Sequence, residues 1–414
     1  MRVVIVNKSN SAGGAAKAAY RLYECLIASK VDAYLISETG SYQGKGLVVL
    51  NSNKWFRIKS FIRERLELLF NTFYKKRSKE RFRVSLIKNG DTVRAINNLN
   101  PTIVHLHWVN DGFLSLFDIK RLNAPIVWSL HDMNPFTGGC HYTGGCENFH
   151  EGCGRCRILG SNQQLDISRY VALRKKTAYD ALNITFIGLS RWIADAASNS
   201  GVTKNSTILN LPNCINVEKY KPIDKNKCRE LWGLNPGNKY IMFGAVNSKD
   251  DPRKGYSYLV NALNQLKSTE TELIVFGSND NTLSEELGIR VHNVGSLKDE
   301  ISLVSLYNCA DVMVVPSLQE NLSNVIMESM SCGTSVVAFN IGGNSDLIRD
   351  KQNGVLCSEV SSDSLAEGID AALLKSKYLG QNARKKIISD YSYNVVSTSY
   401  LDLYKKVLED NVNE

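Results

Sequence analysis

The chain has 414 residues, which is enough for two domains of ordinary size, each with a core of its own. Its 43% hydrophobic and 22% charged residues are typical of a globular protein, and no apolar run reaches the ~18 residues of a membrane-spanning helix. The formal net charge of +9 is concentrated in residues 54–83, which hold eleven Lys and Arg and three Glu, so the rest of the chain is close to neutral.

The chain opens with a pattern of strand, glycine-containing loop and helix. Met1–Val6 is predicted to be a strand, and a helix is predicted from about Ala15 to Ser29. Between them, Gly13 and Gly14 let the backbone approach a ligand closely, although a Gly-Gly pair alone is more often an ordinary turn. The apolar run at residues 3–6 is too short for a signal peptide, so we expect no export and a cytoplasmic location.

The basic stretch 54–83 predicts an amphipathic helix. Its apolar residues recur every three or four positions from Trp55 to Phe73, and the run Lys75–Lys79 follows. Such a helix can lie on an anionic membrane, here the inner face of the cytoplasmic membrane. The alternative is a helix that packs its apolar face on the core and leaves a basic face in solvent. Nucleic-acid binding is less supported, because no recognised module accompanies the charge.

Three later strands of the first half are predicted at Ile103–His107, Ile126–Leu130 and Thr185–Leu189. Side chains at the ends of parallel strands gather where such sheets bind ligands. His131, directly after the second of these strands, is therefore the candidate site residue that we favour over His107. A histidine in this place is also compatible with a purely structural hydrogen-bonding role.

Residues 138–160 form a glycine-rich loop with four of the ten cysteines. These four are Cys140, Cys146, Cys153 and Cys156. Because a reducing cytoplasm disfavours disulfides, clustered thiolates suggest a closed, structural zinc site with four sulfur ligands. His141 and His150 are possible substitutes for one ligand. A disulfide or a reduced loop without metal remains the alternative.

The second half restarts near residue 211 and repeats the alternation of strands and helices. Strands are predicted at 240–245, 273–277, 291–295 and 336–339, and helices at 300–309, 364–374 and 395–408. After the first of these strands comes a loop with Arg253, Lys254 and Gly255. Two adjacent basic residues are usually a solvated surface feature, but with a glycine beside them they also suit a phosphate.

The most informative stretch runs from Val312 to Gly333. A buried parallel strand, 312–315, is stopped by Pro316, and a short helix is expected between an N-cap at Ser323 and a stop at Gly333. Glu320 is placed at the carboxyl end of the strand, and Glu328 lies eight residues further on. The N–H groups at the start of this helix offer a site for a phosphate.

The acids Glu320 and Glu328, together with the following Ser331–Phe339 and Gly342-Gly343, resemble the retaining nucleotide-sugar glycosyltransferases of the group 1 (Glu-x7-Glu) type. That resemblance implies the GT-B architecture, an α/β fold with two Rossmann-like domains, parallel sheets and an interdomain cleft. One departure is Asn321-Leu322-Ser323 where many members have Gly-Phe-Gly.

The resemblance also implies an organisation of domains. Residues 1–210 would be an acceptor-side domain that carries the Cys-rich loop at 138–160. Residues 211–390 would be the nucleotide-sugar donor domain, and residues 391–414 a helix that packs back on the first domain.

Several site roles follow from the resemblance alone. Glu320 is expected to contact the transferred sugar, and Glu328 the ribose of the nucleotide. Arg253 and Lys254 correspond to the basic pair that holds the pyrophosphate, a role shared with the helix start at Asn321, Leu322 and Ser323. Val294-Gly295 resembles the loop that lines the base, Gly13 and Gly14 would close over the diphosphate, and His131 would lie beside the sugar.

The expected activity is transfer of a hexosyl or related group from a UDP- or GDP-sugar to a glycan or lipid-linked acceptor, in surface-polysaccharide biosynthesis. No two Asp residues stand two apart, so an Asp-x-Asp metal motif is missing and we expect no catalytic metal. The competing hypotheses are a nucleotide-sugar epimerase or dehydrogenase, disfavoured by the missing Gly-x-Gly-x-x-Gly fingerprint, and a non-catalytic scaffold that binds membranes or partners.

Overall fold

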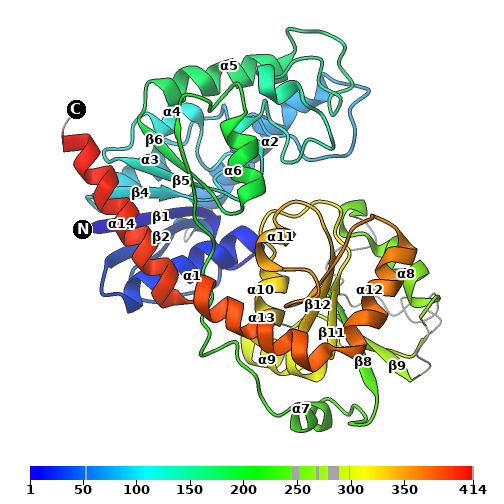
Figure 1. Cartoon of the computed structure of the whole chain (residues 1–414). Helices are drawn as coiled ribbons and strands as arrows, with labels where there is room; N and C mark the ends of the chain where they lie inside the picture. The colour runs from blue at the N-terminus through cyan, green and yellow to red at the C-terminus, as the bar shows by residue number, and fades with distance from the viewer. Residues whose placement is uncertain (52–53, 245–250, 267–269, 278–288, 298, 413–414) are drawn as a thin grey trace. The chain divides into compact units, whose positions relative to one another are not determined.

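A computed structural model describes residues 1–51, 54–244, 251–266, 270–277, 289–297 and 299–412 (Figure 1). These residues form two compact units. Unit 1 comprises Met1–Cys214 together with Val396–Glu414, and unit 2 comprises Ile215–Val395. Within the described ranges, no helix combines the length and apolarity that crossing a bilayer requires.

Unit 1 is built on a parallel sheet of seven strands in the order β3-β2-β1-β4-β5-β6-β7. Its strands are β1 (Arg2–Ser9), β2 (Asp32–Thr39), β3 (Leu47–Val49), β4 (Ile103–Leu106), β5 (Ile126–Leu130), β6 (Ile184–Gly188) and β7 (Thr207–Asn210). In β1, the run Val3–Val6 is fully buried because helices cover both faces of the sheet. The strand order reverses between β1 and β4, which pair from Val3 with Ile103 to Val6 with Leu106.

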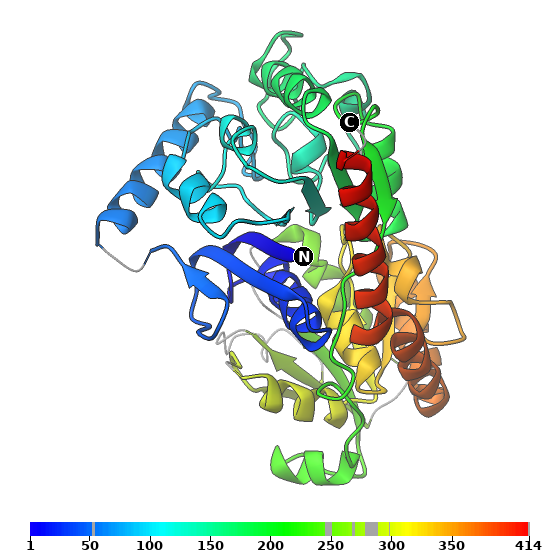
Figure 2. The same cartoon turned by 90° about the vertical axis from the view of Figure 1, so that its left-hand side faces the viewer.

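Helices cover this sheet, as the two views in Figures 1 and 2 show. The longer helices of unit 1 are α1 (Gly14–Ala28), α2 (Lys54–Thr72), α3 (Gly90–Asn97), α5 (Ile167–Asp180), α6 (Arg191–Ser198) and α14 (Tyr393–Val412). Its short helical turns are α4 (Leu116–Ile119), η1 (Asn134–Phe136) and η2 (Asn148–Glu151). In α14, Tyr400 and Tyr404 are almost completely buried, and the rings of both lie within 6 Å of the His105 ring on β4.

Unit 2 repeats the plan with a six-stranded parallel sheet in the order β10-β9-β8-β11-β12-β13. Its strands are β8 (Lys239–Gly244), β9 (Thr271–Phe276), β10 (Val291–Asn293), β11 (Val312–Val315), β12 (Ser335–Phe339) and β13 (Val355–Cys357). Its helices are α7 (Lys225–Leu231), η3 (Pro252–Lys254), α8 (Tyr256–Leu263), α9 (Glu300–Cys309), α10 (Asn324–Ser331), α11 (Asn344–Leu347), α12 (Ser362–Leu374) and α13 (Ser376–Tyr391). The strand order reverses between β8 and β11.

The predicted fold class is confirmed: both units are α/β with parallel sheets in Rossmann-like strand order. The helix predicted from Ser323 to Gly333 is also confirmed, since the Ser323 Oγ accepts the N–H of Ile326 and Gly333 has a φ of 77°. Each sheet has its switch point at the carboxyl ends of two strands, and these two edges are where the candidate site residues lie.

Candidate active site

The carboxyl ends of β8, β9 and β11 in unit 2 surround a pocket of about 110 Å³. Its floor is apolar, with Phe243 and Phe276 from the ends of β8 and β9. Lys254, Glu320 and Ser323 also line it. The structure therefore brings together three of the predicted site residues, which lie up to 69 positions apart in the sequence, at the switch point of one sheet.

The loop that carries Lys254 is held close to the end of β11 by a glycine. Gly255 has a φ of 66°, and a Cβ added to it would lie 1.8 Å from the Pro316 carbonyl oxygen. The Leu318 N–H donates a hydrogen bond of 2.7 Å to the Arg253 carbonyl. Only glycine allows this approach of the two backbones, and the approach is what sets Lys254 beside the residues after β11.

Glu320 is positioned by the turn that follows β12. A Cβ on Gly342 would lie 1.9 Å from the Glu320 carbonyl oxygen, and the same oxygen accepts the Gly343 N–H at 3.1 Å. The Glu320 carboxylate lies 3.4 Å from the Lys254 Nζ, with the lysine side chain 41% exposed. A half-exposed cation next to a carboxylate at the mouth of a pocket is suited to exchange that carboxylate for an anionic ligand.

Arg253, the other member of the basic pair, is turned to a different partner. Its Nε and Nη2 donate to the two carboxylate oxygens of Asp251 at 2.9 and 2.7 Å. Burial opposes ionisation of Asp251, but the Arg253 guanidinium outweighs it and holds the pKa of that carboxyl below its ordinary value. Arg253 is not among the residues that line the pocket.

The short helix α10 buries the second acid. Glu328 is 1% exposed, and its Oε2 accepts a hydrogen bond of 2.9 Å from the Tyr307 hydroxyl on α9. Glu328 is therefore a buried carboxylate that contacts α9, and it is not exposed to solvent. At the start of the helix, Asn321 and Leu322 are buried, while Ser323 provides the cap beside the pocket.

Val294 and Gly295 continue from β10. The Val294 N–H donates to the Val275 carbonyl at 2.9 Å, and the Gly277 N–H donates to the Gly295 carbonyl at 2.8 Å. These contacts attach the segment to the end of β9. Neither residue lines the pocket that contains Lys254, and part of the loop from Val246 to Gly255 lies outside the described residues.

In unit 1 the corresponding edge begins with the loop after β1. Gly13 has a φ of 93° and precedes Gly14, the first residue of α1. A Cβ on Gly13 would meet no heavy atom within 4 Å, so at this glycine the backbone conformation is constrained and the space above it is open.

His131 lies at the end of β5 within a row of buried histidines. Its Nε2 is 2.8 Å from the Nδ1 of His107, so one ring donates and the other accepts. His105 is bound at Nδ1 by the Tyr404 hydroxyl at 2.7 Å and at Nε2 by Ser129 at 2.9 Å. Burial lowers the pKa of His131 to about 4 and that of His105 to about 3. These rings are neutral at pH 7 and act as hydrogen-bonding groups.

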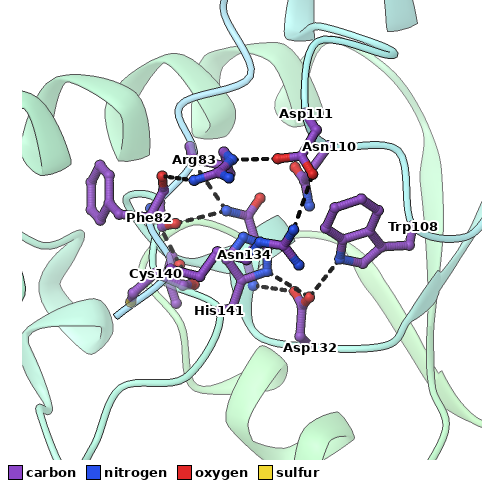
Figure 3. A network of polar contacts seen from close by, with 12 residues as sticks. Phe82, Arg83, Trp108, Asn110, Asp111, Asp132, Asn134, Cys140 and His141 are labelled. Atoms are coloured by element: carbon purple, nitrogen blue, oxygen red, sulfur yellow. Dashed lines mark hydrogen bonds and ion pairs between the residues drawn. The ribbon is translucent and has the colours of Figure 1, made fainter. Parts of the chain in front are cut away.

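Next to His131, Asp132 anchors a polar network (Figure 3). Its Oδ2 accepts from Trp108 Nε1 at 2.8 Å and contacts His141 Nδ1 at 2.7 Å, while its Oδ1 accepts the Asn134 N–H at 2.9 Å. Burial opposes ionisation of Asp132, but His141 and these donors together lower its pKa. His141, considered above as a zinc ligand, is thus engaged by Asp132.

A second part of the network holds the loop after β5 against the segment before α3. The Asn134 side-chain amide donates to the Arg83 and Gly139 carbonyls at 3.1 and 2.8 Å, and Arg83 forms an ion pair with Asp111. The fully buried Lys175 donates to the Asn134 carbonyl at 2.5 Å. Burial lowers the pKa of Lys175 to about 8.

The four cysteines of the loop lie in unit 1 as free thiols. Burial raises the pKa of Cys153 to about 12 and also raises the pKa values of Cys140 and Cys156, with a further contribution from the neighbouring thiols. Across the described ranges, no three His, Cys, Asp or Glu side chains are grouped so that they could hold a metal ion. A zinc site in this loop therefore stays a prediction.

Sequence patterns missed three residues that hold the candidate groups in place. Tyr307 lies on α9 and reads as part of an apolar helix, and Tyr404 is 299 positions away from its partner His105. For Asp132, its position directly after the candidate His131 was the one signal in the sequence that pointed to a role at the site. Hydrogen bonds between residues far apart in the sequence produce no periodic pattern. The roles of Tyr307 and Tyr404 could therefore not be predicted.

Comparisons with known proteins agree with this geometry. Residues 237–375 match the family "Glycosyl transferases group 1". An uncharacterized glycosyltransferase of Methanocaldococcus jannaschii is 31% identical over 45% of this chain, and the match spans only half, 50%, of that relative. A putative colanic acid biosynthesis glycosyl transferase of Escherichia coli is 25% identical over 70% of this chain and 76% of the relative.

Solved structures are similar over the whole chain. A sucrose-phosphate synthase of Thermosynechococcus elongatus superposes with a TM-score of 0.71 at 19% identity, covering 99% of both chains. An Anabaena protein, HepE, solved in complex with UDP and glucose, superposes with a TM-score of 0.65 at 16% identity, covering 98% of this chain and all of the other. At these identities the likeness establishes the GT-B fold, and the family match identifies residues 237–375, which lie in unit 2, as a group 1 glycosyltransferase region.

Proposed function

We propose that the protein is a retaining glycosyltransferase that moves a sugar from a nucleoside-diphosphate sugar to a hydroxyl acceptor. The observation that carries the proposal is the pocket of unit 2, where Lys254, Glu320 and the start of α10 meet at the switch point of the sheet. The complex of HepE with UDP supports a UDP-sugar as the first donor to test.

The chemistry requires a fixed cation in this place. When the bond between sugar and phosphate breaks, negative charge grows on the leaving phosphate, and a preorganised cation stabilises that charge more than it stabilises the ground state. Lys254 supplies the cation at the pocket, and Arg253 joins it when the pyrophosphate displaces Asp251. The N–H groups of the first turn of α10 add a partial positive charge.

Glu320 positions the transferred sugar in this proposal. Its backbone is fixed by Gly343, so its carboxylate stays at the pocket and accepts sugar hydroxyls once the phosphate engages Lys254. In the retaining reaction the leaving phosphate takes the acceptor proton on the same face of the sugar. Glu328 would bind the ribose, whose hydroxyls then compete with Tyr307 for the buried carboxylate.

Unit 1 carries further candidate residues at the switch point of its own sheet. We assign Gly13 and Gly14 to the donor diphosphate, because the positive φ of Gly13 leaves open space above the start of α1. His131 is assigned to a sugar hydroxyl. A neutral imidazole donates or accepts one hydrogen bond without adding charge next to the leaving group. The acceptor would be a glycan or a lipid-linked saccharide of a surface-polysaccharide pathway, as the name of the Escherichia coli relative suggests.

A transfer assay tests the function directly. The purified chain is incubated with a panel of UDP- and GDP-sugars and simple hydroxyl acceptors, and nucleotide release and the anomeric form of the product are followed. We expect release of UDP or GDP and a product with the donor's anomeric configuration. An inverted product would contradict the retaining mechanism, and absence of nucleotide release with every donor would favour a non-catalytic scaffold.

A structural zinc ion in the Cys-rich loop is a separate proposal. It is supported by N–H groups aimed at sulfur: Gly138 donates to Cys153 Sγ at 3.1 Å, and Ile158 and Leu159 donate to Cys156. Such donors accompany thiolates that bind metals. We expect one zinc per chain by elemental analysis after purification without chelator, and its loss in Cys153→Ser/Cys156→Ser. A metal-free native protein with the same melting temperature in EDTA would overturn it.

A further inference from the structure

Helix α2 of unit 1 is packed with its polar side toward the protein. The buried residues of α2 are Ser60, Arg63, Glu67 and Asn71, which recur every three or four positions. Phe56 and Phe70 are half-buried and pack against core residues, but a stripe of large apolar side chains points away from the protein, with exposed fractions from 39% to 81%. They are Trp55, Ile58, Phe61, Ile62, Leu66 and Leu69, continued by Phe73 just after the helix. This arrangement excludes the expected alternative in which the apolar face packs on the core.

Specific hydrogen bonds hold this orientation. Arg63 pairs with Glu38 at 2.8 Å and donates to the Gly112 carbonyl at 3.0 Å. The two oxygens of Glu67 accept the N–H groups of Ser85 and Gly112, each at 2.5 Å. Turning the apolar face inward would break all four of these contacts. Glu38 would keep only Lys8 as a cationic partner, and the N–H groups of Ser85 and Gly112 would lose the Glu67 carboxylate that accepts them, which is costly.

Backbone packing adds to this constraint. A Cβ on Gly112, whose φ is 69°, would lie 3.0 Å from the Cβ of Arg63 and 3.1 Å from its backbone carbon. The helix therefore sits against the 110–112 turn at a distance that only glycine permits. The exposed apolar stripe is a fixed feature of unit 1, and a contiguous exposed apolar surface of this kind marks an interaction site.

Positive charge surrounds the stripe. Lys54, Arg57 and Arg65 on α2 are exposed, and Lys75, Lys76 and Arg77 follow the helix. Beside the stripe, between α2 and the start of α3, lies a pocket of about 500 Å³ whose lining includes Ile62 together with Lys59, Lys88, Arg94 and Arg121. Asp91, the acid in this pocket, already pairs with Lys59 and Arg94.

We propose that α2 docks unit 1 on an anionic phospholipid bilayer, with Trp55 and Phe73 inserted among the lipids and the flanking basic residues on the phosphates. The charge decides between occupants. A second copy of the chain would bring an equal surplus of positive charge to the same stripe and be repelled, whereas an anionic lipid surface complements apolar stripe and basic border together. The proposal goes beyond sugar transfer and does not depend on it.

The test is cosedimentation of the full-length chain with vesicles of equimolar phosphatidylcholine and phosphatidylglycerol, with no donor or acceptor present. The wild type should bind, and Trp55→Ser/Phe73→Ser should weaken binding at least ~10-fold because two apolar side chains no longer leave water. Both side chains are exposed, so the change leaves the fold intact. The matched control is Leu165→Ser/Leu374→Ser, which removes two apolar side chains of similar exposure, 81% and 86%, and should bind like the wild type.

Charge is tested separately. Lys75→Glu/Lys76→Glu should lower binding to these vesicles roughly 10-fold or more, and added salt should reduce the difference. Wild-type protein that stays in the supernatant, or equal loss in the test and control pairs, would overturn the proposal. So would a dimer, seen by analytical ultracentrifugation without vesicles, that Trp55→Ser/Phe73→Ser dissociates, because the stripe would then be covered by a second copy.

Discussion

The two units carry the same sheet order but present opposite electrostatics at their switch points. In unit 2 the edge holds the ion pair between Lys254 and Glu320, whose side chains are partly open to solvent. In unit 1 it holds His105, His107 and His131, which burial keeps neutral. One topology therefore presents an ion pair at the switch point of one unit and uncharged imidazoles at the switch point of the other.

The difference arises from what covers the strand ends. Around β11 the polar side chains stand on loops that glycines bring together, and they keep contact with solvent. Around β4 and β5 the histidines lie among aromatic rings, including those of Tyr400 and Tyr404, and a charged imidazole loses its hydration there. Each of the following changes probes one side of this contrast.

The largest effect is expected for Lys254→Ala. Loss of the cation at the unit 2 pocket should lower turnover by ~100-fold to 1,000-fold, because the leaving phosphate loses a preorganised charge. Turnover is measured by nucleotide release, with the melting temperature as a check on folding. Lys351→Ala is the control, since that side chain is 80% exposed and should be neutral. Equal turnover in both variants would remove Lys254 from the mechanism.

Glycine substitutions compare the two loops. Gly255→Ala places a Cβ 1.8 Å from the Pro316 carbonyl oxygen, so it should cost more than ~3 kcal/mol of unfolding free energy, as conformational strain and backbone collision add. Gly13→Ala meets open space and should cost about 1–3 kcal/mol, the strain of a backbone conformation, φ 93° and ψ 168°, that glycine adopts far more readily than other residues. Chemical denaturation measures both values. Similar costs for the two variants would mean that the loop with Gly255 moves away from Pro316 easily.

Acid should weaken unit 1 through its histidines. His131 has a folded-state pKa of about 4 and an ordinary value of 6.5, so below pH 6.5 the unfolded chain binds the proton first and stability falls until the pH reaches about 4. Between pH 7 and pH 5 this histidine should account for about 2 kcal/mol of the loss. The free energy of unfolding is measured at pH 7 and pH 5 for the wild type and for His131→Asn. Between these two pH values the variant should lose about 2 kcal/mol less than the wild type. An identical pH dependence would show that the ring titrates normally.

The smallest effect is expected for Tyr307→Phe. It removes one hydrogen bond to the buried Glu328 carboxylate and should cost about 1–3 kcal/mol of unfolding free energy. If Glu328 binds the donor ribose, Tyr307→Phe should also change KM for the donor. It should leave kcat unchanged, because the cation at Lys254 is not altered. Tyr378→Phe, at a hydroxyl on the half-exposed ring of α13, provides a control with the same change in atoms.

Much of the fold was predictable because its signals are local. The strands 126–130 and 312–315 and the helix 300–309 have the bounds that were predicted, since buried parallel strands read as apolar runs and their ends are marked by Pro, Gly or a capping residue. β2, β7 and β13 were not predicted, because mixed or short patterns do not stand out from loops. The pocket residues Lys254, Glu320 and Ser323 were found through a motif, whereas the pairing of Arg253 with Asp251 depends on a local geometry that no motif describes.

The orientation of α2 illustrates what sequence alone leaves open. Its periodicity correctly predicted a two-sided helix, and the choice of the buried side was then between core and membrane. The structure places Glu67 and Arg63 inward because the neighbouring turn offers N–H and carbonyl partners at Gly112 and Ser85. Those partners lie 18 to 49 positions away, beyond any pattern within the helix.

His105 and the Tyr404 hydroxyl that binds it lie 299 positions apart in the sequence, and this separation delays their contact during biosynthesis. The ribosome completes all of unit 2, residues 215–395, before it releases the segment that covers β4. At ~5–20 residues per second the wait is on the order of 10–40 s. During that interval unit 1 has its sheet but lacks one covering helix, so a nascent chain should expose an apolar surface there until α14 is synthesised.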